Sequence, residues 1–167
     1  MRTAIDPPAG RDHRARTAAL AAGAVGVLYA AISAYWALGG RWLLSTVGGS
    51  LEHVARGARG PVQAGLWAVV LLKLVASGLP TATTSSILRS RTATIVRRLT
   101  VAEAAVLTLY GLVLSIVGWL VQAGLIAHGA GADRRALAWH AFLWDPWFLA
   151  WGLLVCATLW WSSPASS

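Results

Sequence analysis

Lys73, Glu103 and Asp145 are charged residues that fall within, or at the edge of, long apolar runs of the sequence. A charge inside a membrane is costly to bury, so each of the three is a candidate for function. His140 lies five residues before Asp145, and the two side chains could act as an acid and base pair. The spacing places no nucleophile with this pair, so the sequence alone favours binding over catalysis there.

Lys73 and Glu103 are predicted to approach the same membrane face on two consecutive antiparallel helices. Lys73 stands about seven residues, or roughly 10 Å of helix, from the end of the apolar run 61–80, and Glu103 begins the run 101–127. We expect an ion pair between them that fixes the helix register, or a Lys73 stem that snorkels to the interface. The alternative is that these charges serve a substrate or a proton.

Asp145 is followed directly by Pro146 in the last apolar run, 140–161. Asp at a helix N-cap with Pro at the next position is a helix-start signal, so the run is predicted to begin or break here. In the simpler interpretation Asp145 only caps a helix. In the sharper one a broken helix places this carboxylate in a water-accessible cavity, as at binding sites of transporters.

Aromatic and polar residues of the predicted outer side supply a candidate ligand site. An interfacial aromatic belt accounts for most of the ten tryptophans, and a cavity lined by indoles for a lipid or another apolar ligand is the alternative. Histidines and carboxylates could bind a divalent metal. No two histidines have a metal-site spacing, so we predict neither a metal nor a cofactor. The candidate ligand-binding residues are Asp145, His140, Trp144, Trp147, His53 and Glu52.

The composition indicates a membrane protein. Hydrophobic residues make up 57% of the 167 residues and charged residues only 12%, whereas soluble domains carry roughly 25% charge. The net charge of +8 comes from short basic blocks that flank uncharged runs. That is the pattern of membrane-flanking charge, and it argues against nucleic acid as a partner.

Four apolar runs are long enough to span a bilayer. We predict an all-α bundle of four transmembrane helices in one membrane domain, 17–162, with a basic tail at 1–16 and a short tail at 163–167. Residues 81–100 are expected to form a basic amphipathic helix on the lipid surface or a solvated loop. The predicted spans are 17–39, 61–80, 101–127 and 140–161.

The distribution of arginine predicts the orientation. Eight arginines fall in the segments 1–16 and 81–100, and five fall in the two other loops. Positive residues concentrate on the cytoplasmic side, so both termini are predicted to be cytoplasmic in the plasma membrane of a bacterium. Gly111, Ser115 and Gly118 recur at helical spacing and form a predicted helix-packing face. The bilayer is the expected partner, together with a homo-oligomer or another membrane protein.

Two aromatic segments carry a resemblance to a known family. The segments are Ala141 to Leu149, read as AFLWDPWFL, and Tyr35 to Gly40, read as YWALGG. On these the chain resembles small multi-pass membrane proteins of actinobacteria that are catalogued as a domain of unknown function. The resemblance implies four helices and a plasma-membrane location, and it transfers no activity and no site residue.

A more distant likeness is to sterol-isomerase-like membrane proteins, which combine carboxylates, a histidine and tryptophans in a small helical bundle. Glu52, His53, Glu103 and Asp145 supply these residue types without reproducing the spacing of the motifs.

From the sequence as a whole we expect a non-enzymatic accessory or structural membrane subunit. The first alternative is a binder or transporter of a small molecule or lipid near Asp145. The second is a small membrane enzyme acting on a lipid-like substrate.

Overall fold

The computed structural model describes residues 8–48, 60–127, 129 and 132–163. All regular secondary structure in this part of the chain is helical, and it contains no strand. Four helices in it are long and apolar enough to cross a membrane, as predicted. They are α1 (Pro8–Ala37), α3 (Pro61–Thr83), α4 (Ser90–Gln122) and a composite helix built from α5 (Arg134–Trp139), η2 (His140–Trp144) and α6 (Asp145–Trp161).

Two of the long helices extend into segments that were predicted to lie outside the spans. The predicted tail 1–16 is helical from Pro8 onward, because the residues that follow are mostly alanine and arginine, which favour helix. The predicted loop or surface helix at 81–100 is divided, and its second half forms the first turns of α4 from Ser90. No proline or glycine interrupts α4 before Gly111, so nothing in the sequence stops this helix at the membrane edge.

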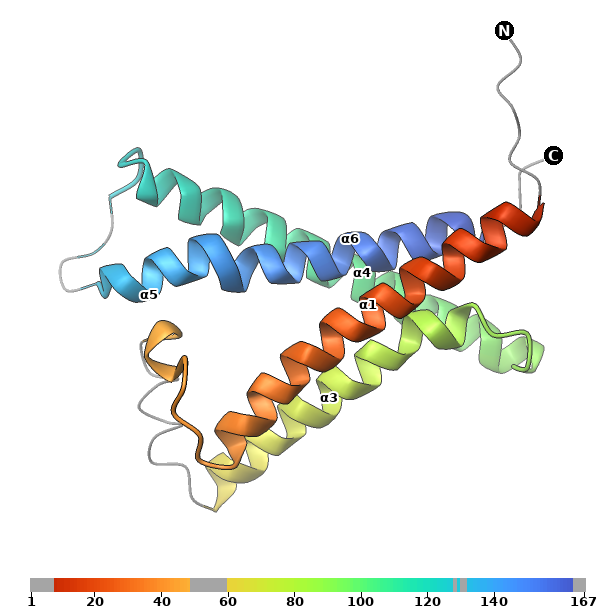
Figure 1. The fold of residues 1–167 in the computed structure, drawn as a ribbon, viewed down its shortest axis with the longest axis horizontal. Coiled ribbons are helices and arrows are strands. Elements are labelled where there is room, and N and C mark those ends of the chain that lie inside the picture. Colours follow the sequence, from red (N-terminus) through yellow and green to blue (C-terminus); the bar gives the residue numbers. More distant parts are fainter. Residues whose placement is uncertain (1–7, 49–59, 128, 130–131, 164–167) are drawn as a thin grey trace, which may run out of the picture.

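The helices form two antiparallel pairs that cross each other (Figure 1). One pair is α1 with α3 and the other is α4 with α6, and α1 packs against α6 to join them. At one end of the bundle α1 and α4 begin and α3 and α6 end, so the start of α1 lies close to the end of α6. We call this the arginine-rich end, and the opposite end, with η1 (Leu44–Thr46) and α5, the aromatic end.

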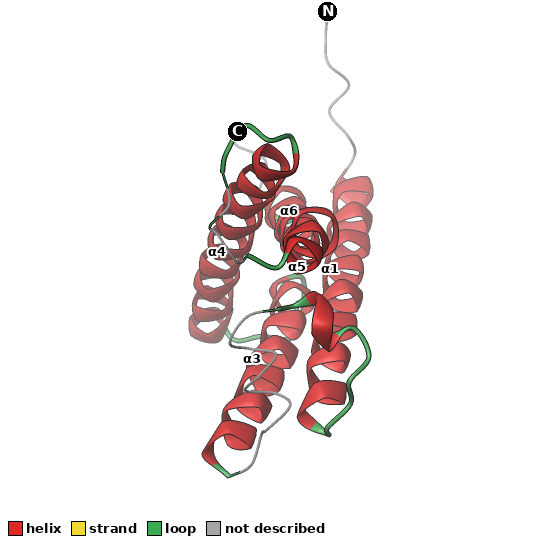
Figure 2. Cartoon of the chain, turned by 90° about the vertical axis from the view of Figure 1, so that its left-hand side faces the viewer, coloured by secondary structure: helices red, strands yellow, loops and turns green. Residues whose placement is uncertain are grey.

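The two pairs separate toward the aromatic end. Figure 2 views the molecule from this end, where α4 and α5 lie apart from the far ends of α1 and α3. Near the arginine-rich end the turn between α3 and α4 is tied by a hydrogen bond of 2.7 Å between the hydroxyls of Thr83 and Thr100. From that point α3 and α4 diverge (Figure 1), so α3 keeps α1 as its main neighbour.

Small residues set how closely the helices approach. A side chain at Gly26 of α1 would overlap the indole of Trp151 and the hydroxyl of Ser77, and one at Gly111 of α4 would overlap the backbone at Leu149. Gly118 similarly faces Ala141. The predicted face formed by Gly111, Ser115 and Gly118 therefore packs against the composite fourth helix of the same chain. A substitution that separated the two helices would lose these packing contacts and lower the stability of the bundle.

The fourth span is continuous through Pro146. Its backbone stays helical from α5 to α6, and one π-helical turn, η2, precedes the proline. Proline lacks the N–H for an i−4 hydrogen bond, and its ring crowds the carbonyl of residue i−4. A wider turn accommodates both effects. Asp145 is therefore not the N-cap that the sequence predicted: its side chain turns back toward the preceding residues.

Candidate functional site

Polar and aromatic side chains from all four spans converge in the half of the bundle near the aromatic end. We call this group the polar–aromatic cluster. Its polar members are Asp145 and His140 on the fourth span, Lys73 on α3 and Ser33 on α1. Aromatic rings pack around them, and the η1 loop covers one side. The rings belong to Tyr29, Trp36, Tyr110, Trp144, Trp147 and Phe148.

The π-helical turn is what brings His140 and Asp145 together. The backbone N–H of Asp145 donates to the carbonyl of His140, a bond that spans five residues. The side chains follow the same spacing, and Nδ1 of His140 lies 3.2 Å from a carboxylate oxygen of Asp145. In a regular α-helix residues five apart face different directions. Single π turns of this kind occur frequently at functional sites.

His140 faces an acceptor on both of its ring nitrogens. Nε2 lies 3.1 Å from the carbonyl oxygen of Val47, opposite the Asp145 contact. A neutral imidazole has only one N–H, whereas both contacts need a donor if Asp145 is a carboxylate. The geometry therefore fits an imidazolium paired with a carboxylate, or a proton carried by Asp145. In either form the pair is neutral overall, which suits a buried setting: the Asp145 side chain is only 7% exposed.

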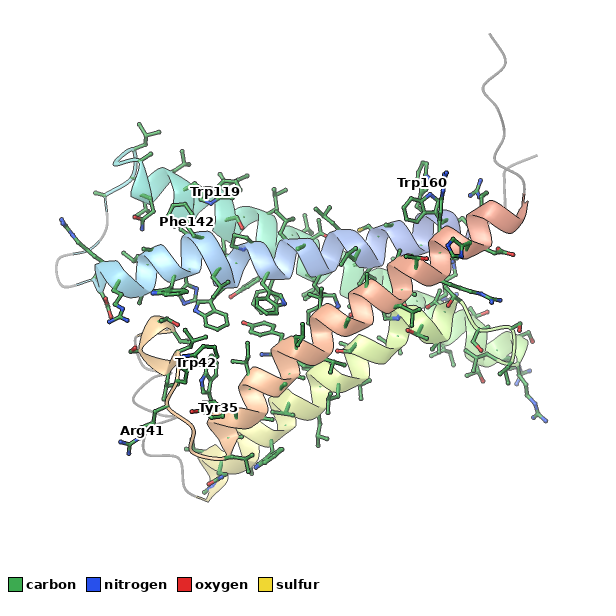
Figure 3. All side chains as sticks on the ribbon, viewed as in Figure 1. Tyr35, Arg41, Trp42, Trp119, Phe142 and Trp160 are labelled. Atoms are coloured by element: carbon green, nitrogen blue, oxygen red, sulfur yellow. The ribbon has the colours of Figure 1, made fainter. Side chains whose placement is uncertain are left out.

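The same turn holds the loop after α1. The indole N–H of Trp144 donates to the hydroxyl of Thr46 over 3.2 Å, and that indole is almost fully buried. Together with the contact between His140 and Val47, this attaches η1 to the fourth span. Figure 3 shows Tyr35, Arg41 and Trp42 on this part of the chain, where the indole N–H of Trp36 donates to the carbonyl of Trp42.

Lys73 reaches into the cluster from α3. Its ammonium donates to the hydroxyl of Ser33 over 2.7 Å and lies 3.7 Å from the centre of the Tyr29 ring. A cation over an aromatic face is attracted by the ring quadrupole, and desolvation strengthens the attraction. Lys73 has no carboxylate partner in the part of the chain that the structure describes. Its charge is stabilised by a hydroxyl and an aromatic face alone.

Tyr29 stands at the centre of the cluster. Its ring packs against Trp144 at 5.9 Å, Trp147 at 5.7 Å and Phe148 at 4.9 Å between centroids. Asp145 directly follows Trp144, whose ring stacks on Tyr29, so its carboxylate belongs to the same part of the cluster. The cluster thus has a cation on one face of an aromatic ring and a carboxylate near the same ring, and the two charges do not pair with each other.

Glu103 lies apart from this cluster, and the predicted ion pair with Lys73 is wrong. Both oxygens of Glu103 are shielded from solvent and have no hydrogen-bond partner among the described residues. Lys73 stands ten residues, or roughly 15 Å, before Thr83, whereas Glu103 stands three residues, or roughly 4.5 Å, after Thr100. The hydrogen bond between Thr83 and Thr100 places these two threonines at the same depth in the bundle. The two charges therefore sit at different depths on diverging helices.

The remaining predicted site residues fall into two groups. Trp144 and Trp147 belong to the cluster, and Trp147 donates to the carbonyl of Val25 over 3.3 Å. Glu52 and His53 lie outside the described residues. Within the described part of the chain no three histidine, cysteine or acidic side chains are grouped so that they could hold a metal ion. Three cavities with described linings lie elsewhere, two at the arginine-rich end and one beside Gln122 and Arg134.

Sequence reasoning missed the contribution of α1. Tyr29, Ser33 and Trp36 are not among the predicted site residues, although they recur at spacings of four and three residues and so share one helical face. A polar residue and two aromatic residues on one face of an apolar helix were the available signal. Thr46 and Tyr110 gave no such signal, because their roles depend on how the loop and α4 pack in three dimensions.

The comparisons with known proteins give a family and no activity. A family model described as "Protein of unknown function (DUF3995)" matches residues 26–155. The matched region runs from the second half of α1 to near the end of α6, so it contains the polar–aromatic cluster. No curated protein matches the chain, and no solved structure matches it.

Proposed function

The chain belongs to the DUF3995 family, and we propose that it is a non-enzymatic membrane protein that binds a small amphipathic molecule or a lipid through the polar–aromatic cluster. The observation that carries this proposal is that Lys73 lies over the ring of Tyr29 without a carboxylate partner among the described residues, while the nearby Asp145 pairs with His140. A charge without an ionic partner destabilises a bundle that needs only to fold, so the presence of Lys73 in this cluster favours a ligand.

The contacts of each charge suggest the chemistry of the ligand. Lys73 offers an ammonium that is now shared between a hydroxyl and a ring, so an acidic group on a ligand would be a stronger partner. The pair of His140 and Asp145 offers a carboxylate for a hydroxyl or amine donor. The surrounding indoles suit an apolar or aromatic body. A molecule with one acidic group, one donor and an apolar body would use all three features.

The η1 loop is the natural route into the cluster. Hydrogen bonds of Thr46 with Trp144 and of Val47 with His140 join it to the fourth span, and Leu44 packs beside them as a buried residue. The large buried rings fill the space beneath it. We infer that a ligand enters when this loop lifts, which would break two hydrogen bonds and leave the helices in place. Entry would then be from the predicted outer side, in the plasma membrane, with both termini cytoplasmic.

Native mass spectrometry on gently extracted protein, with native lipid retained, tests the proposal. We expect a reproducible adduct that is lost in Asp145→Asn and in Lys73→Met. The matched control is Glu103→Gln, which removes another intramembrane carboxylate outside the cluster and should keep the adduct. Absence of any defined adduct, or its equal retention in all three variants, contradicts a ligand at this site.

A second candidate function, an accessory subunit acting through helix contacts, is favoured by α3. Only 11% of its apolar window is buried within the bundle, against 39% for α1. A partner helix or a second copy would cover this face. We expect Leu72→Trp to abolish a defined complex in the same spectra, whereas Val106→Trp on exposed α4 should not. A monomeric mass for the wild-type protein under gentle extraction would count against this role.

A further inference from the structure

Two adjoining cavities lie at the arginine-rich end, remote from the polar–aromatic cluster. The larger has a volume of about 310 Å³ and lies between the first turns of α1 and the segment that ends α3. The smaller, of about 270 Å³, shares Arg16 and three hydroxyl residues with it and adds Asp12 on its far side. We call the larger one the hydroxyl pocket. Its polar lining is Arg16, Thr81, Thr84, Ser85 and Ser86.

Three of these side chains have hydrogen-bond donors that are not used within the described structure. The guanidinium of Arg16 and the hydroxyls of Thr81 and Ser86 make no hydrogen bond to any described residue. Thr84 and Ser85 are engaged locally, with the carbonyl of Thr81 and the N–H of Ile87. A guanidinium and several hydroxyls that line one hollow are the donor set that a phosphate group prefers.

Two other arginines at the same end, Arg11 and Arg97, donate hydrogen bonds to described residues, whereas Arg16 does not. Arg11 donates to the carbonyls of Trp160 and Ser163, and so satisfies backbone acceptors at the end of α6. Arg97 donates to the hydroxyls of Ser162 and Ser163. These two arginines connect the end of α6 to α1 and α4. Arg16 lines both cavities and has no such bond within the described residues, so its charge is available to a ligand.

The apolar part of the lining indicates where the phosphate comes from. Leu20 and Ile87 complete the hydroxyl pocket, and they are 64% and 90% exposed. Leu20 lies one helical turn beyond Arg16, toward the apolar run of α1. An exposed leucine and isoleucine directly beside a cationic hollow, at the membrane edge of a predicted span, match the junction between a phospholipid headgroup and its acyl chains.

We propose that the hydroxyl pocket binds the phosphate of an anionic glycerophospholipid. Arg16 and the free hydroxyls of Thr81 and Ser86 bind the phosphate oxygens, while Leu20 and Ile87 contact the acyl chains. The other arginines at this end raise the local concentration of anionic lipid, and Asp12 opposes the anion from the smaller cavity. The proposal is independent of the ligand at the polar–aromatic cluster.

The test uses the full chain in detergent and measures lipid binding by native mass spectrometry. Phosphatidylglycerol and phosphatidylcholine of matched acyl chains are titrated against the wild type and single variants. We expect Arg16→Gln to weaken binding of phosphatidylglycerol roughly tenfold, because one charge-assisted contact is lost. Asp12→Asn should strengthen it. The matched control is Arg91→Gln, which removes the same charge from the same end without lining either cavity, and should change binding less than about twofold.

Three outcomes would overturn the assignment. If phosphatidylcholine binds as tightly as phosphatidylglycerol, the site does not require an anionic lipid. If Arg91→Gln weakens binding of phosphatidylglycerol as much as Arg16→Gln does, the effect comes from the general positive charge of this end. Displacement of the lipid by millimolar inorganic phosphate, with phosphate bound in its place, would overturn the lipid and leave a site for free phosphate. If Arg16→Gln does not fold, Ser86→Ala decides: several-fold weaker binding supports the pocket, and unchanged binding overturns it.

Discussion

Asp145 and Glu103 are both carboxylates in the apolar part of a predicted span, yet their surroundings differ in kind. Asp145 has a histidine partner, a backbone that widens to bring that partner within 3.2 Å, and a loop that packs over both. Glu103 has two solvent-shielded oxygens with no partner among the described residues. The difference shows that an intramembrane carboxylate cannot be interpreted from its depth alone. The local backbone decides whether it becomes part of a network.

The largest expected effect comes from breaking the network at Asp145. Asp145→Ala removes the acceptor of His140 and leaves that ring facing a carbonyl and an empty space. Removing one member of a buried pair typically costs 3–5 kcal/mol. Because the His140 side chain is 37% exposed, we expect a loss of only about 2–3 kcal/mol. Reversible unfolding in mixed micelles measures this free energy, and a loss below 1 kcal/mol would contradict the network.

Glu103 should respond with the opposite sign. Glu103→Leu replaces an unpartnered buried carboxyl with an apolar group of similar size, so the free energy of unfolding should rise by about 1 kcal/mol. The same unfolding assay measures it, with Glu103→Gln as the polar control that keeps the shape. A destabilisation as large as that of Asp145→Ala would show that Glu103 has a stabilising partner, and the contrast between the two carboxylates would fail.

An effect of similar size to that at Glu103, but of opposite sign, is expected at Lys73, the cation of the cluster. Lys73→Met keeps the length of the side chain and loses one hydrogen bond and one contact with the face of Tyr29. The relief from burying a charge offsets part of this loss, so we expect a destabilisation of about 1 kcal/mol. A double-mutant cycle of Lys73→Met with Ser33→Ala isolates the hydrogen bond. A coupling energy near zero would show that the Lys73 ammonium does not bond the Ser33 hydroxyl.

The sequence was sufficient for the four-helix fold, because the length and apolarity of each run leave few other structures for it in a membrane. The DUF-type family resemblance is also confirmed. The helices α1 and α4 begin at Pro8 and Ser90, before the spans predicted to begin at 17 and 101, since charge marks the membrane edge and does not stop a helix of alanine and arginine. The orientation of the termini, the plasma membrane and the actinobacterial origin stay predictions.

The candidate site was less accessible from sequence for a geometric reason. Asp145, His140, Trp144 and Trp147 were selected by residue type, and the structure brings them together with Lys73. The pairing of Lys73 with Glu103 was wrong because it assumed that consecutive helices stay in contact along their length, whereas α3 and α4 diverge beyond Thr100. The link between His140 and Asp145 required a π turn, which the α-helical period does not contain.

The smallest expected effect concerns the origin of that turn. Pro146→Ala restores an N–H that can bond the carbonyl of Phe142, so the π turn should relax to an α-helix. Residues five apart then lie roughly 140° apart around the axis, and His140 and Asp145 should separate. The overall stability should change by less than about 1 kcal/mol, because replacing a proline within a helix gains up to about 3 kcal/mol and offsets the loss of the contact between His140 and Asp145.

A double-mutant cycle between His140→Ala and Asp145→Ala measures the separation, when it is run with and without Pro146→Ala. The coupling energy should be present with the proline and should disappear in the Pro146→Ala background. If the coupling persists, the turn is fixed by contacts across the bundle, such as the bond of 2.8 Å from the Trp119 indole to the carbonyl of Ala141. The contrast between the two carboxylates would then originate in tertiary packing, independently of the proline.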